Sequence, residues 1–163
     1  MTTLARFITA LNRGLFGLAK WLVYAIVALM LWEVVQRYFL SHPTSWAPEL
    51  ATLVFGPFFL LGGPFMLHTG GHVAVDLLSS RATGRLARGL HLAGLALAAA
   101  FGLILLWFSL PLVLQSISYG ETSYSAWNPV VWPAKAFLPL GAGLLVLQAL
   151  ADAILAFAAE DDA

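Results

Sequence analysis

An acidic and a basic side chain, Glu33 and Arg37, lie four residues apart in an apolar part of this 163-residue sequence. On a helix this spacing places both on one face, and pairing lowers the cost of holding two charges near a membrane boundary. A paired carboxylate is a poor proton relay. We therefore expect this pair to anchor a helix end or to link it to another helix, and not to move ions.

Three potential metal ligands, His68, His72 and Asp76, recur at every fourth position and would share one face of an unbroken helix. The dipeptide Gly70-Gly71 lies between them and is expected to end that helix. A haem would need axial ligands from facing helices, and His91 is the other membrane-adjacent candidate. The chain has no cysteine, so thiolate sites are excluded. We expect no metal, no cofactor and, because no nucleophile has a base at hand, no enzymatic activity.

Two long runs without Asp, Glu, Lys or Arg, residues 50–75 and 89–120, indicate what positions these side chains. A membrane-spanning helix needs about 20 apolar residues, and in lipid a helix satisfies its own backbone hydrogen bonds. Charged residues make up 10% of the chain, against about 25% in soluble domains. The sequence therefore predicts a single all-α membrane domain, residues 1–163, with four spans near residues 15–40, 46–67, 90–115 and 131–157. Zero net charge and the lack of a long basic run exclude a nucleic-acid partner.

Two further segments are predicted to be amphipathic. Residues 1–20 combine apolar side chains at helical spacing with cations seven residues apart, as in a helix lying on the membrane surface. The segment between the second and third spans carries arginines on one face, which fits lipid contact or docking to a partner subunit. We expect lipid-phosphate contact and a topology signal from these six cations: Arg6, Arg13, Lys20, Arg81, Arg85 and Arg88.

The cations also predict the orientation of the chain. Six lie on the side of the termini, whereas Arg37 and Lys135 lie near the other side. The positive-inside bias then places both termini and the middle loop in the cytoplasm. Aromatic residues, which favour the headgroup layer, mark the opposite boundary: Trp46, Tyr119, Tyr124, Trp127 and Trp132.

Other residues are typical of helix ends and helix packing. Glu49 follows Pro48 at the start of the second span, where a carboxylate complements the helix N-terminus. Lys135 and Asp152 lie near opposite ends of the fourth span, and we expect each to reach its own interface. In the third span, Gly94, Ala98 and Gly102 form a stripe of small residues that lets helix backbones approach closely.

The sequence offers little that a transport path would need. It has no phosphate-binding glycine loop, and its two halves do not repeat each other with paired broken helices, as in many transporters. Four spans leave little room for a private substrate pathway. An accessory or scaffold subunit of a larger membrane complex fits best. The alternatives are a stand-alone four-helix redox protein of the cytochrome kind and a small self-assembling channel or transporter.

An ordered set of short motifs is similar to a known family. Arg37-Tyr38, the stretch 45–50 (SWAPEL) and the stretch 70–76 (GGHVAVD) are followed by 132–141 (WPAKAFLPLG) and 145–148 (LVLQ). This order resembles the small, DctQ-type membrane subunit of tripartite ATP-independent periplasmic (TRAP) transporters over nearly the whole chain. The chain departs from the pattern at Pro48, where the family often carries a second acid before Glu49.

The resemblance implies a role without a substrate site in this chain. In such systems a periplasmic binding protein delivers an organic acid, and a large elevator-type subunit carries the sodium and substrate sites in the bacterial inner membrane. The small subunit packs against the stationary scaffold of the large one. On this basis the following residues are candidates for the subunit interface or its support: Glu33, Arg37, Trp46, Glu49, His72, Asp76, Gly94, Ala98, Gly102 and Lys135.

Overall fold

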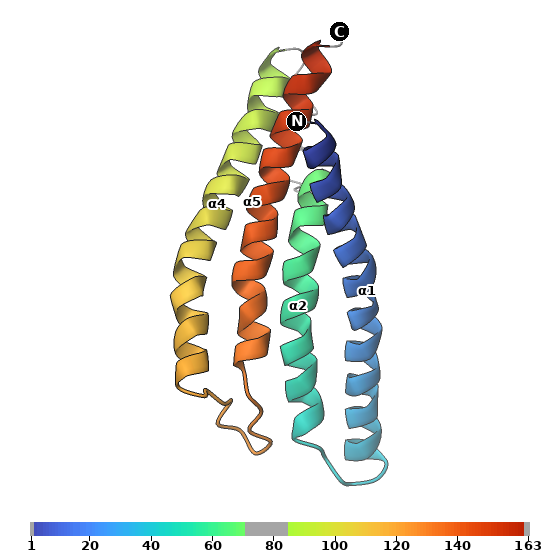
Figure 1. The fold of residues 1–163 in the computed structure, drawn as a ribbon. Coiled ribbons are helices and arrows are strands. Elements are labelled where there is room, and N and C mark those ends of the chain that lie inside the picture. Colours follow the sequence, from blue (N-terminus) through green and yellow to red (C-terminus); the bar gives the residue numbers. More distant parts are fainter. Residues whose placement is uncertain (1, 71–84, 162–163) are drawn as a thin grey trace.

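The computed structural model describes residues 2–70 and 85–161, which form four long helices (Figure 1). The helices are α1 (Thr2–Tyr38), α2 (Trp46–His68), α4 (Arg85–Ser118) and α5 (Trp132–Asp161). Each is long and apolar enough to cross a membrane. The described residues hold no strand, and Thr122 and Val130 form an isolated bridge. The all-α membrane fold is therefore confirmed, with each predicted span inside or nearly coincident with one helix.

The four helices lie side by side in the order α4, α5, α2, α1 (Figure 1). Contacts join α4 to α5, α5 to α2 and α2 to α1, and α1 also reaches α5. Within the described residues, α4 touches neither α1 nor α2. The start of α1 and the end of α5 lie at one end of the molecule, called here the terminal end (Figure 1). The α1–α2 and α4–α5 loops lie at the other, the loop end.

Small residues fill the few buried positions. The buried apolar set is Ala5, Ala19, Ala47, Ala51, Leu95, Val113, Ala142, Ala149 and Ala151. Large apolar side chains, among them Trp107 and Phe108, are mostly exposed. Lipid is as apolar as leucine, so membrane helices associate through close packing of small residues and through polar contacts. The exposed apolar faces suit lipid or a further membrane protein.

The N-terminal segment differs from its prediction. A separate surface helix over residues 1–20 is not seen, because α1 is one unbroken helix of 37 residues. No proline interrupts it, and Gly14 and Gly17 are tolerated in a helix that lipid and neighbours support. Ala5 and Asn12 are buried in the packed structure. The amphipathic segment thus extends the first span at about 1.5 Å per residue to a length of about 55 Å.

Prolines inside the helices do not break them. Pro57 and Pro64 lie within α2, Pro111 within α4 and Pro139 within α5. Each ring removes one backbone donor, and neighbouring helices and local adjustment can re-satisfy the carbonyl that loses its partner. Continuous helices through these positions keep the polar residues on either side in a fixed register.

Candidate functional site

Glu33 fastens the loop end of α1 to the chain that follows it. Its side chain is buried, and Arg37 donates to Oε1 from Nε at 2.9 Å and also from a terminal nitrogen. Thr44, in the α1–α2 loop, donates to Oε2 from its backbone nitrogen at 3.0 Å and from its hydroxyl. The predicted pairing of Glu33 with Arg37 is confirmed, and the carboxylate also fixes the loop. Arg37 itself is about half exposed (49%), which leaves part of the guanidinium available to a neighbour.

Two further contacts hold the α4–α5 loop at this end. Ser125 donates from its hydroxyl to Oε2 of Glu49, on the first turn of α2, at 2.6 Å. Lys135, near the start of α5, pairs with Glu121 of the loop. This ammonium, hydrogen bonded to the carboxylate, lowers the pKa of Glu121 from its ordinary value. Glu49 and Lys135 thus join their helices to the α4–α5 loop within the subunit.

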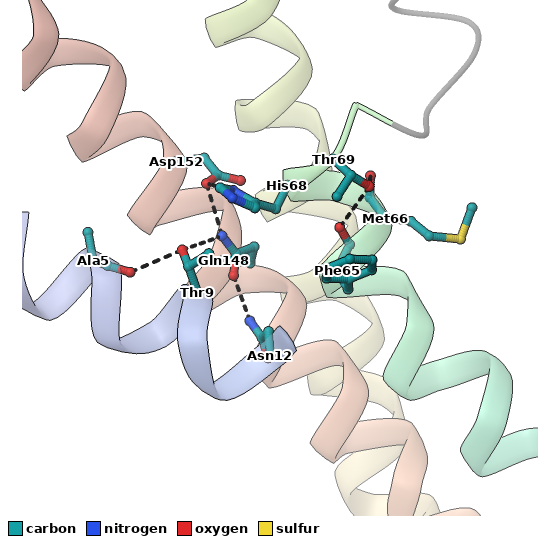
Figure 2. Close-up of polar contacts among 9 residues, drawn as sticks. All are labelled: Ala5, Thr9, Asn12, Phe65, Met66, His68, Thr69, Gln148 and Asp152. Carbon is teal, nitrogen blue, oxygen red and sulfur yellow. Dashed lines mark hydrogen bonds and ion pairs between the residues drawn. The ribbon is translucent and has the colours of Figure 1, made fainter. Parts of the chain in front are cut away.

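A polar cluster joins three helices nearer the terminal end (Figure 2). Gln148 of α5 is fully buried and donates from Nε2 to the hydroxyl of Thr9 at 3.1 Å and to Oδ1 of Asp152 at 2.9 Å. Its carbonyl accepts from Nδ2 of Asn12 at 2.8 Å. His68 of α2 completes the cluster, with Nδ1 2.7 Å from Oδ1 of Asp152. Helices α1, α2 and α5 are therefore cross-linked by hydrogen bonds between side chains that are largely buried.

Asp152 corrects a sequence-based expectation. We expected its side chain to reach the nearest interface, but it is 9% exposed and bonded to His68 and Gln148. The cluster had a signal in the sequence. Gln148 and Asp152 are polar, lie four residues apart in a long apolar helix and therefore share one face of it. Thr9 and Asn12 gave the matching signal at a spacing of three, but assigning residues 1–20 to the membrane surface hid it.

The predicted small-residue stripe on α4 is divided between two surroundings. A Cβ on Gly102 would lie 2.7 Å from Cγ2 of Val146 and 3.2 Å from the backbone oxygen of Ala142, so this glycine packs against α5. Gly94 and Ala98 instead line an apolar groove of about 660 Å³ that α2, α4 and α5 enclose. The stripe therefore serves packing within the subunit at one position and leaves a groove at the other two.

The predicted cations fall into three groups. Arg6 and Arg13 line a cleft between α1, α2 and α5. Lys20 lies over the ring of Trp21, with Nζ 5.9 Å from the centroid, and Arg88 stacks on Phe157 at 5.5 Å. Arg85 is the first residue of α4. The candidates His72, Asp76 and Arg81 lie outside the described residues, and Trp46 begins α2 at the loop end.

Comparison with known proteins places this helical arrangement in a family. The model of the tripartite ATP-independent periplasmic transporters, DctQ component, matches residues 26–159. The chain belongs to the DctQ family. It is thus a component of a TRAP transporter, a multi-pass membrane protein of the small permease kind, as the order of motifs indicated.

A curated relative of this DctQ chain is the sialic acid TRAP transporter small permease protein SiaQ of Vibrio cholerae serotype O1 (strain ATCC 39315 / El Tor Inaba N16961). The two are 30% identical over 60 residues. The match spans 37% of this chain and 35% of the relative, about a third of each.

Family membership does not favour the cytochrome-like alternative. In residues 2–70 and 85–161, no three His, Asp or Glu side chains gather as metal ligands would. His68, one of the three residues considered for a metal, is paired with Asp152 in this DctQ chain. The polar groups described here hold helices and loops together.

Proposed function

We propose that this chain is the stationary small subunit of a sodium-driven TRAP importer of organic acids. In this proposal the sodium and substrate sites lie in a large elevator-type partner, and a periplasmic binding protein delivers the substrate. The chain widens and steadies the scaffold past which the moving domain of the large subunit slides.

One observation carries the proposal: the carboxylates whose side chains the structure describes are engaged in holding the chain together. Glu33 binds the α1–α2 loop, and Asp152 joins α5 to α2. Glu49 of α2 binds Ser125 of the α4–α5 loop, and Glu121 of the same loop binds Lys135 of α5. Carboxylates that are already hydrogen bonded or paired within the chain are poor binding sites for ions that must bind and leave during transport. The chemistry of transport is therefore assigned to the partner.

Three further observations support parts of the proposal. The exposed apolar faces of the four helices offer a broad surface to a large membrane partner. Similarity to the small permease protein of a sialic acid transporter supports an acid as the transported substrate. The bias of cations toward the terminal end supports insertion in a bacterial inner membrane with both termini in the cytoplasm.

Co-purification with a large TRAP membrane subunit, to be sought in the neighbouring reading frames, tests the proposal. Arg37→Ala should reduce the amount of large subunit recovered several-fold, because it removes a half-exposed guanidinium whose partner inside the chain is Glu33. Any intact complex that remains should bind sialic acid, used here as the first substrate probe, with unchanged affinity. Lys20→Ala is the matched control, since it removes one exposed cation elsewhere on α1 and should leave recovery unchanged.

Two results would overturn the proposal. One is a loss of substrate affinity in the Arg37→Ala complex with normal subunit recovery. The other is sodium-driven uptake by liposomes that contain this chain alone, which would make it a transporter in its own right.

A further inference from the structure

A cleft of about 520 Å³ opens between α1, α2 and α5 beside the polar cluster. Arg6 and Arg13 face it from α1, together with Thr9, Ala10 and Gly14. His68 of α2 and Leu155 of α5 complete its lining. Residues from three separate helices thus build one pocket, which we call the arginine cleft.

The position of the arginine cleft relative to the membrane follows from the lengths of the helices. From Trp46 to His68, α2 rises about 33 Å, and from Trp132 to Leu155, α5 rises about 35 Å, at about 1.5 Å per residue. The hydrocarbon core is about 30 Å thick. With the tryptophans at the boundary of the loop end, His68 and Leu155 therefore reach the opposite boundary. The cleft lies where the phosphates of that leaflet are.

The two arginines of the cleft have no acidic partner among the side chains that the structure describes. Seven residues apart on α1, the two are separated by about 10.5 Å along the helix axis, and both long side chains can converge on one anion between them. Guanidinium groups bind phosphate oxygens in pairs of parallel hydrogen bonds.

The polar cluster gives the cleft a fixed wall. Thr9 donates to the carbonyl oxygen of Ala5 at 3.1 Å and accepts from Gln148, so its position on the floor of the cleft is set. His68 is held through Nδ1 by Asp152, which leaves Nε2 as the ring nitrogen able to meet a ligand. A wall held by hydrogen bonds across three helices reduces the conformational entropy that a ligand must remove on binding.

We propose that the arginine cleft binds the phosphate of an anionic phospholipid, with Arg6 and Arg13 as its main ligands. A basic pocket between membrane helices on the cytoplasmic side is the setting in which cardiolipin and similar headgroups bind. Leu155, Ala10 and Gly14 provide an apolar side for the glycerol and the first acyl carbons. The site does not depend on the proposed partner, because all of its lining comes from this chain.

Native mass spectrometry of the full-length chain, delipidated in detergent, tests this site. We expect one tightly bound cardiolipin or phosphatidylglycerol per chain, and weaker binding of zwitterionic phosphatidylethanolamine. The double variant Arg6→Gln/Arg13→Gln should weaken the anionic lipid at least about tenfold, a loss that corresponds to about 1.4 kcal/mol. Both arginines are exposed, so folding should be unaffected, and circular dichroism with gel filtration verifies it.

Two controls separate a built site from general attraction to an anionic surface. Lys20→Gln removes a cation from the same helix outside the cleft and should leave the bound lipid unchanged. Arg6→Lys/Arg13→Lys keeps the charge but loses the paired hydrogen bonds, and should fall between the wild type and the glutamine variant. An equal loss in Lys20→Gln would overturn the site. Binding of inorganic phosphate alone as tightly as lipid would overturn the lipid as its occupant.

Discussion

Gln148 shows how much of this subunit depends on a single side chain. Its carboxamide uses both of its ends, accepting from Asn12 and donating to Thr9 and Asp152, with no exposed surface. In an apolar surrounding such a group is favourable where its partners are present, and costly where they are removed. The three helices α1, α2 and α5 therefore share one set of hydrogen bonds, centred on this carboxamide.

Replacing this residue tests that dependence. Gln148→Leu should destabilise the chain by about 1–3 kcal/mol, because it leaves the buried Nδ2 of Asn12 without its partner and removes one of the two partners of Oδ1 of Asp152. The buried Asn12 is especially sensitive to this loss, since its Oδ1 already has no hydrogen-bond partner. Reversible unfolding by sodium dodecyl sulfate in mixed micelles measures the difference. Gln115→Leu, on an exposed position of α4, is the control and should have little effect; equal stability of both variants would contradict the role given to Gln148.

At the scale of elements, close approach between α5 and α2 depends on Gly141. A Cβ at this position would lie 2.9 Å from the backbone oxygen of Leu60 and 3.0 Å from its Cβ. A backbone atom cannot move aside as the end of a flexible side chain can. The seam between the two middle helices is therefore set by the absence of a side chain at one position.

A pair of glycine substitutions on one helix tests this seam. Gly141→Ala should destabilise the chain by about 1–3 kcal/mol, the usual cost of overpacking. Gly143→Ala, two residues away with no atom within 4 Å of its Cβ, should be neutral or stabilise by up to about 1 kcal/mol through helix propensity. The same micelle unfolding measures both. A Gly141→Ala chain as stable as Gly143→Ala would show that the helices separate without cost.

The elements were more predictable than the contacts between them. Apolar runs and the cost of unpaired backbone in lipid are enough to locate four helices, and the spacing of Glu33 and Arg37 predicts their pairing, because both depend on local sequence. Thr44 as the second partner of Glu33, and the meeting of Asn12 with Gln148, depend on which helices are neighbours. That order is set by small residues such as Gly102 and Gly141, whose partners a single sequence does not identify.

At the scale of the whole molecule, the start of α1 and the end of α5 lie at one end of the helices, and the α1–α2 and α4–α5 loops lie at the other. In the orientation proposed above, the cations of residues 1–20 face the cytoplasm and the α4–α5 loop faces the periplasm. The chain has no native cysteine, so single cysteines can report on each side. In spheroplasts, a membrane-impermeant maleimide should label Ala126→Cys readily and Thr3→Cys after lysis. Labelling of Thr3→Cys in intact spheroplasts would reverse the proposed orientation.

The order of the helices in the layer also bears on how the chain is made. Each of its two outer seams, α1 with α2 and α4 with α5, is formed by helices that are consecutive in the sequence. In each of these pairs, the first helix can therefore pack against the second as soon as the second leaves the ribosome. The contacts of α5 with α2 and α1, which carry the polar cluster, form only after α5, the last of the four helices in the sequence, has been made. The buried hydrogen bonds around Gln148 are therefore a mark of completed assembly, formed after every helix has been inserted.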